Sequence, residues 1–372
     1  MKARCETGRL TASLAFRVFA AQKCFRVKPP EIKVGVPAGL FTGCAARRRT
    51  HARAIFSLLA LAGALLLAVG FAACARPERP LRVGANVWPG YEPLFLARSL
   101  GYYDRQTIQL INFSSAVEVL HAYRNGAIDV AAVTGDEALQ VTETLPGLRI
   151  VLVCDFSQGA DAILAQPQFQ SMRALRGRRI GVEPNVLGAY ILGRALELSG
   201  LTPADVTVVP VRLLANEQAY ASDQVDAVVT FDPHRTRLIA AGARSVFDTT
   251  QIPGEVVDLL ITRQELVESR AVALRSLVHG WFRALDYLRA HPHDAAVKMA
   301  LRETMTPEEF TATLQGLELP DRAANARLLG PGQDNLVPAL RRLSDIMVQY
   351  KLLLRPVDPS GLLDARFVPE AK

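Results

Sequence analysis

Apolar and polar positions after residue 80 follow a regular alternation. Short apolar runs, rich in β-branched residues, have the length of buried strands, and segments with helical spacing separate them. Strands are expected at residues 81–86, 107–113, 128–133, 149–156, 161–165, 178–182, 206–211, 225–230, 244–247 and 256–262. From residue 264 onward the pattern is almost purely helical. Strands that alternate with helices predict parallel sheets covered on both faces.

Two extended links, near residues 156–162 and 253–259, bracket the second group of strands. Because the chain crosses twice, the second group forms a lobe inserted into the first. We therefore expect a two-lobed α/β protein with a helical C-terminal portion. Lobe 1 is expected to comprise residues 81–160 and 255–372, and lobe 2 residues 161–254. Such a hinged clamp can close around a ligand held between its lobes.

A different pattern precedes Cys74. Residues 55–73 form an uncharged, mostly apolar run after a cluster of arginines at residues 47–49 and 53. A basic segment, an apolar segment and a small-residue exit are the order of an export signal. The exit Phe71-Ala72-Ala73-Cys74 resembles a bacterial lipoprotein signal, although Phe71 stands where that motif usually has Leu. The alternatives are a plain cleaved signal, an uncleaved anchor of about 20 residues, or a buried helix.

This division predicts the roles of the N-terminal segments. Residues 1–54 form a leader extension with the basic region, residues 55–73 the apolar part of the signal, and residues 74–80 a lipidated, proline-containing tether. We expect an exported protein, in the periplasm or at the cell surface, that is anchored to a membrane through lipid on Cys74. Only Cys154 follows Cys74, and it is expected to be a small buried apolar residue.

The net charge of +7 belongs to the leader. Residues 1–73 hold 12 of the 43 Lys and Arg but only 2 of the 36 Asp and Glu, so the remainder carries a net charge of −3. A basic stripe, the usual footprint of a nucleic-acid-binding surface, is therefore not expected. We expect no nucleic-acid partner.

Candidate ligand-binding residues come from the carboxyl ends of the predicted strands, where ligands bind in open parallel sheets. They are Asn86, Trp88, Tyr91, Thr134, Asp136, Glu137, Ser157, Asp161, Glu183, Asn185, Tyr190, Thr230 and Asp232. Several have a purely structural alternative. Trp88 could fill a loop against the core, and Asp136 and Glu137 could be helix N-terminal acids. Asp232 could be a helix cap, whereas Asp161 begins an apolar strand, where an unpaired acid is costly.

The sequence shows no set of residues typical of catalysis. There is no GxSxG, no Walker loop and no GxGxxG after a strand. The one dense histidine group, residues 291–294, contains a proline at a helix start and is typical of an exposed cap rather than a metal site. We expect no enzyme activity, no cofactor and no metal.

Five blocks in order carry a resemblance to a known family. They are residues 86–91 with 96–97 and 101–102, then 125–129, 134–137, 157–161 and 226–230. The blocks resemble the sulfonate/nitrate/thiamine-precursor group of ABC-transporter substrate-binding proteins, over about residues 81–350. The resemblance implies a type II periplasmic-binding-protein fold. It also implies a role, which is to capture a small solute and deliver it to a membrane permease powered by a separate ATPase.

The acids at the strand ends bear on the solute. These ends carry Asp136, Glu137, Asp155, Asp161, Glu183 and Asp232, and their one basic residue is Arg235. A binding site lined by acidic and aromatic side chains suits a neutral or cationic N-heterocycle or amine, such as a pyrimidine that resembles a thiamine precursor. A sulfonate, nitrate or other anion is the alternative, and it needs positive potential from Arg, Lys or helix N-termini.

Two further alternatives concern the role itself. One is a sensory protein that uses the same clamp to signal to a membrane kinase or cyclase. The other is an enzyme on the same fold. A fungal part of the family makes a pyrimidine with a Cys-rich iron motif, and this chain has no cysteine cluster of that kind.

Overall fold

The computed structural model describes residues 78–370, and these residues belong to one compact unit. The expected leader, the signal run and the lipid-accepting Cys74 therefore lie outside the described residues. Within residues 78–370, no helix is both long enough and apolar enough to cross a bilayer.

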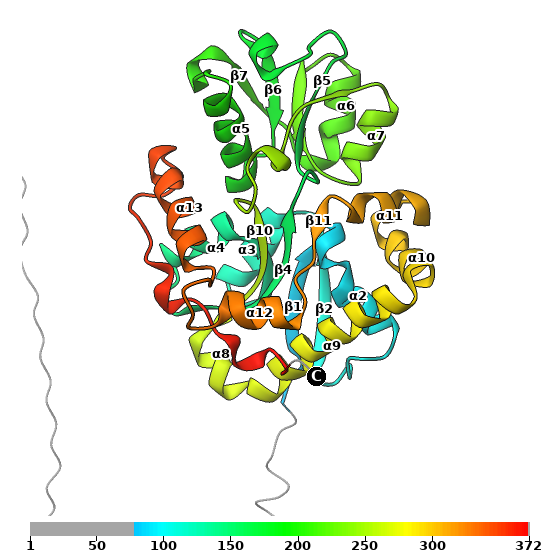
Figure 1. The fold of residues 1–372 in the computed structure, drawn as a ribbon, viewed down its shortest axis with the longest axis vertical. Helices are drawn as coiled ribbons and strands as arrows, with labels where there is room; N and C mark the ends of the chain where they lie inside the picture. The colour runs from blue at the N-terminus through cyan, green and yellow to red at the C-terminus, as the bar shows by residue number, and fades with distance from the viewer. Residues whose placement is uncertain (1–77, 371–372) are drawn as a thin grey trace, which may run out of the picture. The chain divides into compact units, whose positions relative to one another are not determined.

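Two sheets organise the described residues (Figure 1). The larger, in lobe 1, has six strands in the order β11-β4-β10-β3-β1-β2. These strands are β1 (Leu81–Asn86), β2 (Ile108–Phe113), β3 (Val130–Thr134), β4 (Leu148–Ser157), β10 (Val257–Arg263) and β11 (Leu317–Glu318). The smaller, in lobe 2, has the order β7-β6-β8-β5-β9. Its strands are β5 (Ala162–Ala165), β6 (Arg179–Val182), β7 (Thr207–Pro210), β8 (Ala227–Thr230) and β9 (Arg244–Asp248).

Helices cover both faces of the larger sheet, because its central strands are apolar on both faces. In β3, Val130 and Ala132 pack with α2, α9 and α10, whereas Ala131 and Val133 pack with α3, α4 and α13. The helices of lobe 1 are α2 (Glu92–Ser99), α3 (Ala116–Arg124), α4 (Gly135–Thr142), α8 (Gln264–Ser269), α9 (Ala271–Ala290), α10 (Pro292–Glu303), α11 (Pro307–Leu314), α12 (Arg322–Leu329) and α13 (Val337–Gln349). Those of lobe 2 are α5 (Val186–Leu198), α6 (Asn216–Ala221) and α7 (His234–Ala240).

The two-lobed α/β fold predicted from the sequence is confirmed, but the prediction of parallel sheets was wrong in part. β10 runs antiparallel to both β3 and β4, and β5 runs antiparallel to both β8 and β9. The double crossing explains the direction of β10, since β4 carries the chain out of lobe 1 and β10 carries it back. The exact lobe boundaries at residues 160 and 254 stay a prediction.

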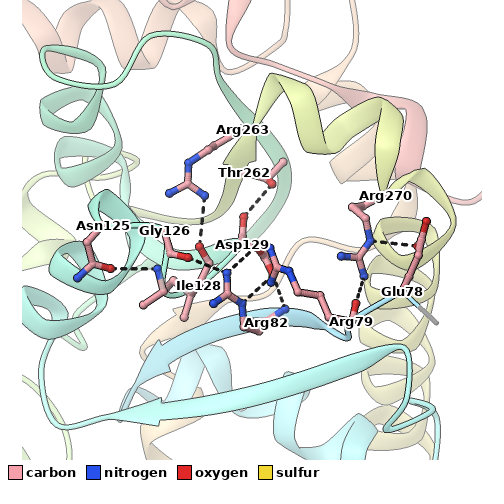
Figure 2. A network of polar contacts seen from close by, with 11 residues as sticks. Glu78, Arg79, Arg82, Asn125, Gly126, Ile128, Asp129, Thr262, Arg263 and Arg270 are labelled. Atoms are coloured by element: carbon pink, nitrogen blue, oxygen red, sulfur yellow. Dashed lines mark hydrogen bonds and ion pairs between the residues drawn. The ribbon is translucent and has the colours of Figure 1, made fainter. Parts of the chain in front are cut away.

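A network of polar contacts around Asp129 holds the first described residues to lobe 1 (Figure 2). Both carboxylate oxygens of Asp129 accept from the Arg79 guanidinium, at 2.9 and 3.0 Å, and both also accept from Arg82, at 3.1 and 3.0 Å. Arg270 donates to the backbone oxygen of Arg79 at 2.6 Å. Hydrogen bonds from Arg82 and Arg79 outweigh the effect of burial and lower the pKa of Asp129 to about 2. The chain therefore enters β1 from a fixed position.

Candidate functional site

A cavity lies between the edges of the two sheets. Its lining comes from Asn86, Trp88, Tyr91, Ala116, Thr134, Glu137, Asp161, Glu183, Asn185, Leu187, Phe231 and Asp258. Eight of the thirteen candidate residues are in this set, and Thr230 lines an adjoining cavity. The space is about 30 Å³, roughly the volume of one water molecule. A larger solute therefore needs the lobes to move apart before it can enter.

The lobe 1 wall begins where β1 ends. Trp88 is 4% exposed, and its indole Nε1 donates to Asp155 Oδ2 at 3.3 Å. The ring of Trp88 also meets Phe231 of lobe 2 edge to face, with centroids 5.4 Å apart. Tyr91, in the short 3₁₀ helix Pro89–Tyr91, donates its hydroxyl to the carboxylate of Asp258. Trp88 is thus both a buried packing residue and a residue of the cavity wall.

The start of α4 supplies the next part of this wall. Thr134 is the N-cap, and the backbone N–H of Thr134 donates to Glu137 Oε2 at 3.1 Å in a capping box. The other carboxylate oxygen of Glu137 has no hydrogen-bond partner within residues 78–370. The capping alternative for Glu137 therefore accounts for one of its oxygens and not for the other.

Lobe 2 contributes a second helix start. Asn185 caps α5, since its Oδ1 accepts from the backbone N–H of Gly188 at 2.8 Å. Its Nδ2 donates to Glu183 Oε2 at 3.0 Å, which fixes that carboxylate at the cavity. Asp161 lies where the chain crosses into lobe 2 and is 2% exposed.

Asp258 is a lining residue that the sequence analysis missed. The search covered only the carboxyl ends of strands that were assumed to be parallel. Because β10 is antiparallel, the edge of the sheet that faces the cavity holds its N-terminal end, where Asp258 lies opposite Thr134 and Asp155. The double crossing predicts that the strand returning to lobe 1 is antiparallel. With that prediction, the search would have included the N-terminal end of this strand and found Asp258.

Four candidate residues lie outside the cavity lining. Ser157 shares a hydrogen bond of 2.8 Å with Thr249, and Tyr190 donates to Glu255 at 2.6 Å. Asp232 accepts from Thr236 and, at 3.0 Å, from Thr313 of lobe 1. Asp136 is buried in the first turn of α4. A ligand contact for these four stays a prediction, because a solute would reach them only after a rearrangement.

Burial dominates the electrostatics of the site. Desolvation raises the pKa of Asp161 to about 7 and that of Glu183 to about 6. Desolvation is also the largest cause of the raised pKa values of Glu137, Asp155 and Asp258, and neighbouring carboxyls add to it. No Lys, Arg or His is among the residues that line this cavity in the described structure. The nearest basic candidate, Arg235, forms an ion pair with Asp232 at 3.8 Å.

Contacts between the lobes flank the cavity. On one side, Arg237 of α7 donates to the backbone oxygen of Thr304 at 3.2 Å and to its hydroxyl at 2.6 Å. On the other side, Arg194 of α5 forms a two-pronged ion pair with Glu255, at 2.7 and 2.9 Å. In the described part of the chain, no group of three or more His, Cys, Asp or Glu is arranged to hold a metal ion.

Comparison with known proteins gives a family and a fold. The sequence model of the NMT1-like family matches residues 75–302. A protein of Brucella abortus (strain 2308), named "Putative binding protein", is 25% identical over an alignment of 298 residues, and the match covers 75% of this chain and 88% of that protein.

Solved structures with the same fold include both binding proteins and an enzyme. The alkanesulfonate-binding protein SsuA from Xanthomonas axonopodis pv. citri, bound to MOPS, has a TM-score of 0.64 at 19% identity and covers 76% of this chain and 97% of its own. A zinc-bound ligand-binding component of an ABC-type import system from Staphylococcus aureus has a TM-score of 0.66 at 12% identity, covering 79% and 99%. The desulfurization enzyme DSZB has a TM-score of 0.60 at 20% identity, covering 78% and 98%.

Proposed function

The chain belongs to the NMT1-like family, and from that premise we propose that it is the exported solute-binding component of an ABC importer. It captures a small molecule between its two lobes and delivers it to a membrane permease powered by an ATPase. The observation that carries this proposal is a closed, polar cavity at the edges of two sheets that two crossing segments join. Import-system and binding proteins of the same fold support it.

The solute is a neutral or cationic N-heterocycle or amine. The cavity presents carboxyl groups of Glu137, Asp161, Glu183 and Asp258, and its aromatic side chains are those of Trp88, Tyr91 and Phe231. Carboxyl oxygens accept hydrogen bonds from N–H groups, and aromatic rings stack on flat ligands. A pyrimidine that resembles a thiamine precursor has both features.

An anion is the second candidate, and one observation favours it. The starts of α4 and α5 both reach the cavity, and helix N-termini attract negative charge. A sulfonate-binding protein of the same fold agrees with this alternative. Against it, Asn185 already accepts from the backbone N–H of Gly188 in the first turn of α5, and Glu137 accepts from the backbone N–H of Thr134, the N-cap of α4.

A thermal-shift screen of the mature protein tests the function. We expect one class among pyrimidines, amines, sulfonates and inorganic anions to raise the midpoint of unfolding. A ligand at a hundredfold excess over its Kd adds about 2.7 kcal/mol to the free energy of unfolding. The responding solute should also change the small-angle scattering profile, since entry requires the lobes to separate. The proposal fails if no solute in the screen raises the midpoint.

Two measurements separate the alternative roles. Turnover of the responding solute by the purified protein would favour an enzyme, the role of DSZB on this fold. Co-purification with a membrane kinase or cyclase instead of a permease would favour a sensory role. We expect neither, because binding followed by release to a permease needs no chemical step.

A further inference from the structure

Asp258 lies at the floor of the cavity, on the strand that returns the chain to lobe 1. Its side chain is 2% exposed, and in register it lies between Thr134 on β3 and Asp155 on β4. The hydroxyl of Tyr91 donates to one of its oxygens. Asp258 is therefore a fixed carboxyl group that faces both the cavity and a second acid.

Asp155 lies directly beside it and is fully buried. One of its oxygens accepts from Trp88 at 3.3 Å, and the other has no partner within the described residues. The backbone at Gly90 approaches so closely that a Cβ there would lie 1.9 Å from Asp155 Oδ2. Only glycine at position 90 lets Asp155 stay in this position.

The groups that act most strongly on Asp258 are acidic or neutral. They are Tyr91 from the 3₁₀ helix, Asp155 from β4, Glu137 from α4 and Asp161 from the crossing segment, and Cys154 also lies close by. The basic Arg235 acts on Asp161, where it opposes the rise in pKa. Two adjacent carboxyls in a low dielectric do not both ionise without a counter-charge. When no cation is present, at least one carboxyl of the pair Asp155 and Asp258 is therefore protonated.

Other buried acceptors point to the same kind of ligand. Glu137 Oε1 and Asp161 Oδ2 belong to residues that line the cavity, and neither has a hydrogen-bond partner within residues 78–370. Both residues are at least nine-tenths buried. A buried acceptor without a donor is costly, so these atoms indicate a ligand that donates hydrogen bonds.

We propose that Asp258, supported by Asp155, sets the charge of the solute by pairing with a cationic N–H group such as an amidinium or a protonated amine. When the cation binds, a carboxyl of the pair that was protonated releases its proton to water, so that the positive charge of the ligand replaces that of the proton. The inference deepens the proposed function and rests on it. Asp258 is the specificity-determining residue, and Asp155, which does not line the cavity, is a positioning residue.

Three probes that share one ring test the inference. Benzamidine is a cation, benzamide is neutral and benzenesulfonate is an anion. We expect benzamidine alone to raise the unfolding midpoint at millimolar concentration. Titration calorimetry at pH 7, in two buffers with different ionisation enthalpies, should show release of about one proton per benzamidine bound.

Variants connect the result to Asp258. Asp258→Asn keeps the shape but cannot ionise, so benzamidine should bind at least tenfold more weakly and the proton release should disappear. Glu303→Gln is the matched control, because Glu303 is a fully buried acid of lobe 1 that does not line the cavity. It should leave both the affinity and the proton count unchanged.

The outcomes separate this inference from the proposed function. If benzamide or benzenesulfonate binds as tightly as benzamidine, or if Asp258→Asn retains the wild-type affinity, the inference is overturned while the protein remains a solute binder. The same holds if the wider screen finds a solute but benzamidine gives no response. If no solute of any class binds, the proposed function fails and this inference fails with it.

Discussion

Asp161 and Glu183 make the stability of the ligand-free protein depend on pH. Their pKa values in the folded state are about 7 and about 6, above the value of about 4 for an unfolded chain. Folding therefore favours their neutral forms. The stability that this provides is fully present below about pH 4 and is lost as the pH rises through about 7.

We expect the free energy of unfolding to fall between pH 5 and pH 8, with Asp161 contributing about 1–3 kcal/mol of that fall. Asp161→Asn should remove this part of the slope, as measured by urea denaturation at both pH values. Asp129→Asn is the control. Because the pKa of Asp129 is lowered to about 2, its stabilisation is present above about pH 4, and the variant should lose nearly the same stability at both. An unchanged slope in Asp161→Asn would contradict the prediction.

The hydrogen bond from Trp88 to Asp155 is a second feature at this scale. Trp88→Phe removes the donor and leaves both oxygens of Asp155 without a partner within residues 78–370. We expect a loss of about 1–3 kcal/mol in the free energy of unfolding beyond the loss of packing.

Trp281→Phe provides the packing reference. Trp281 is fully buried, and its indole N–H has no partner in the described part of the chain. The same ring is truncated in both variants, so the difference between their urea midpoints measures the hydrogen bond. Equal losses of stability in Trp88→Phe and Trp281→Phe would show that Trp88 stabilises the protein only through packing.

At the scale of elements, two features of the site were beyond the sequence pattern. Trp88 and Glu183 were found because they follow strands that were recognised by their apolar runs. Asp258 was missed because strand direction is decided by the tertiary path and leaves no mark on the apolar run itself.

The bounds of helix α12, within the region expected to be helical, could not be found from the sequence for a related reason. Its sequence, RAANARLL, has little apolar periodicity. Its position is fixed instead by Asn325, whose side chain pairs with the backbone N–H and oxygen of Val153 on β4, at 2.8 and 3.1 Å. β11 has only two residues and exists because it pairs with the end of β4. Tertiary contacts of this kind are not local properties of the chain.

The contact between α7 and the turn after α10 links the two lobes. Arg237→Gln removes the hydrogen bonds to Thr304 and so weakens the closed arrangement without touching the cavity. Arg237 is substantially exposed, and exposed pairs contribute about 1 kcal/mol or less. Because a solute larger than one water molecule enters only when the lobes separate, we expect its affinity to rise by about fivefold or less, as measured by titration calorimetry.

Arg341→Gln is the matched control for this contact. Arg341 pairs with Asp358 at 3.2 Å, and both residues belong to lobe 1. Its affinity should equal that of the wild type. A wild-type affinity in Arg237→Gln as well would show that the α7 contact does not favour closure.

At the scale of the whole molecule, the predicted lipid anchor at Cys74 would determine where the clamp operates. We predict that Cys74→Ser prevents acylation and releases the protein from membranes, because we expect the Cys74 thiol to carry the lipid. Fractionation of cells that express the variant checks this, with Cys154→Ser as the control, since Cys154 is buried in lobe 1. A variant at Cys74 that remains in the membrane fraction would contradict the lipid anchor.

One hydrophobic cluster extends across both lobes. It includes Leu139 of α4, Leu343 of α13 and Ile191 of α5. The same side also has polar contacts, from the Tyr350 hydroxyl to Glu197 and from Arg194 to Glu255. Salt weakens exposed charges and leaves apolar burial in place. Added salt should therefore weaken the polar contacts on both sides of the cleft and leave this apolar packing unchanged.

β10 directly follows the second crossing segment between the lobes, and it also carries Asp258, which lines the cavity. An opening motion that bends this strand would therefore also tilt the carboxyl group of Asp258. Recognition and motion would thus be coupled through one strand. A substitution at Asp258 that changes the preferred solute would also change how readily the two lobes separate.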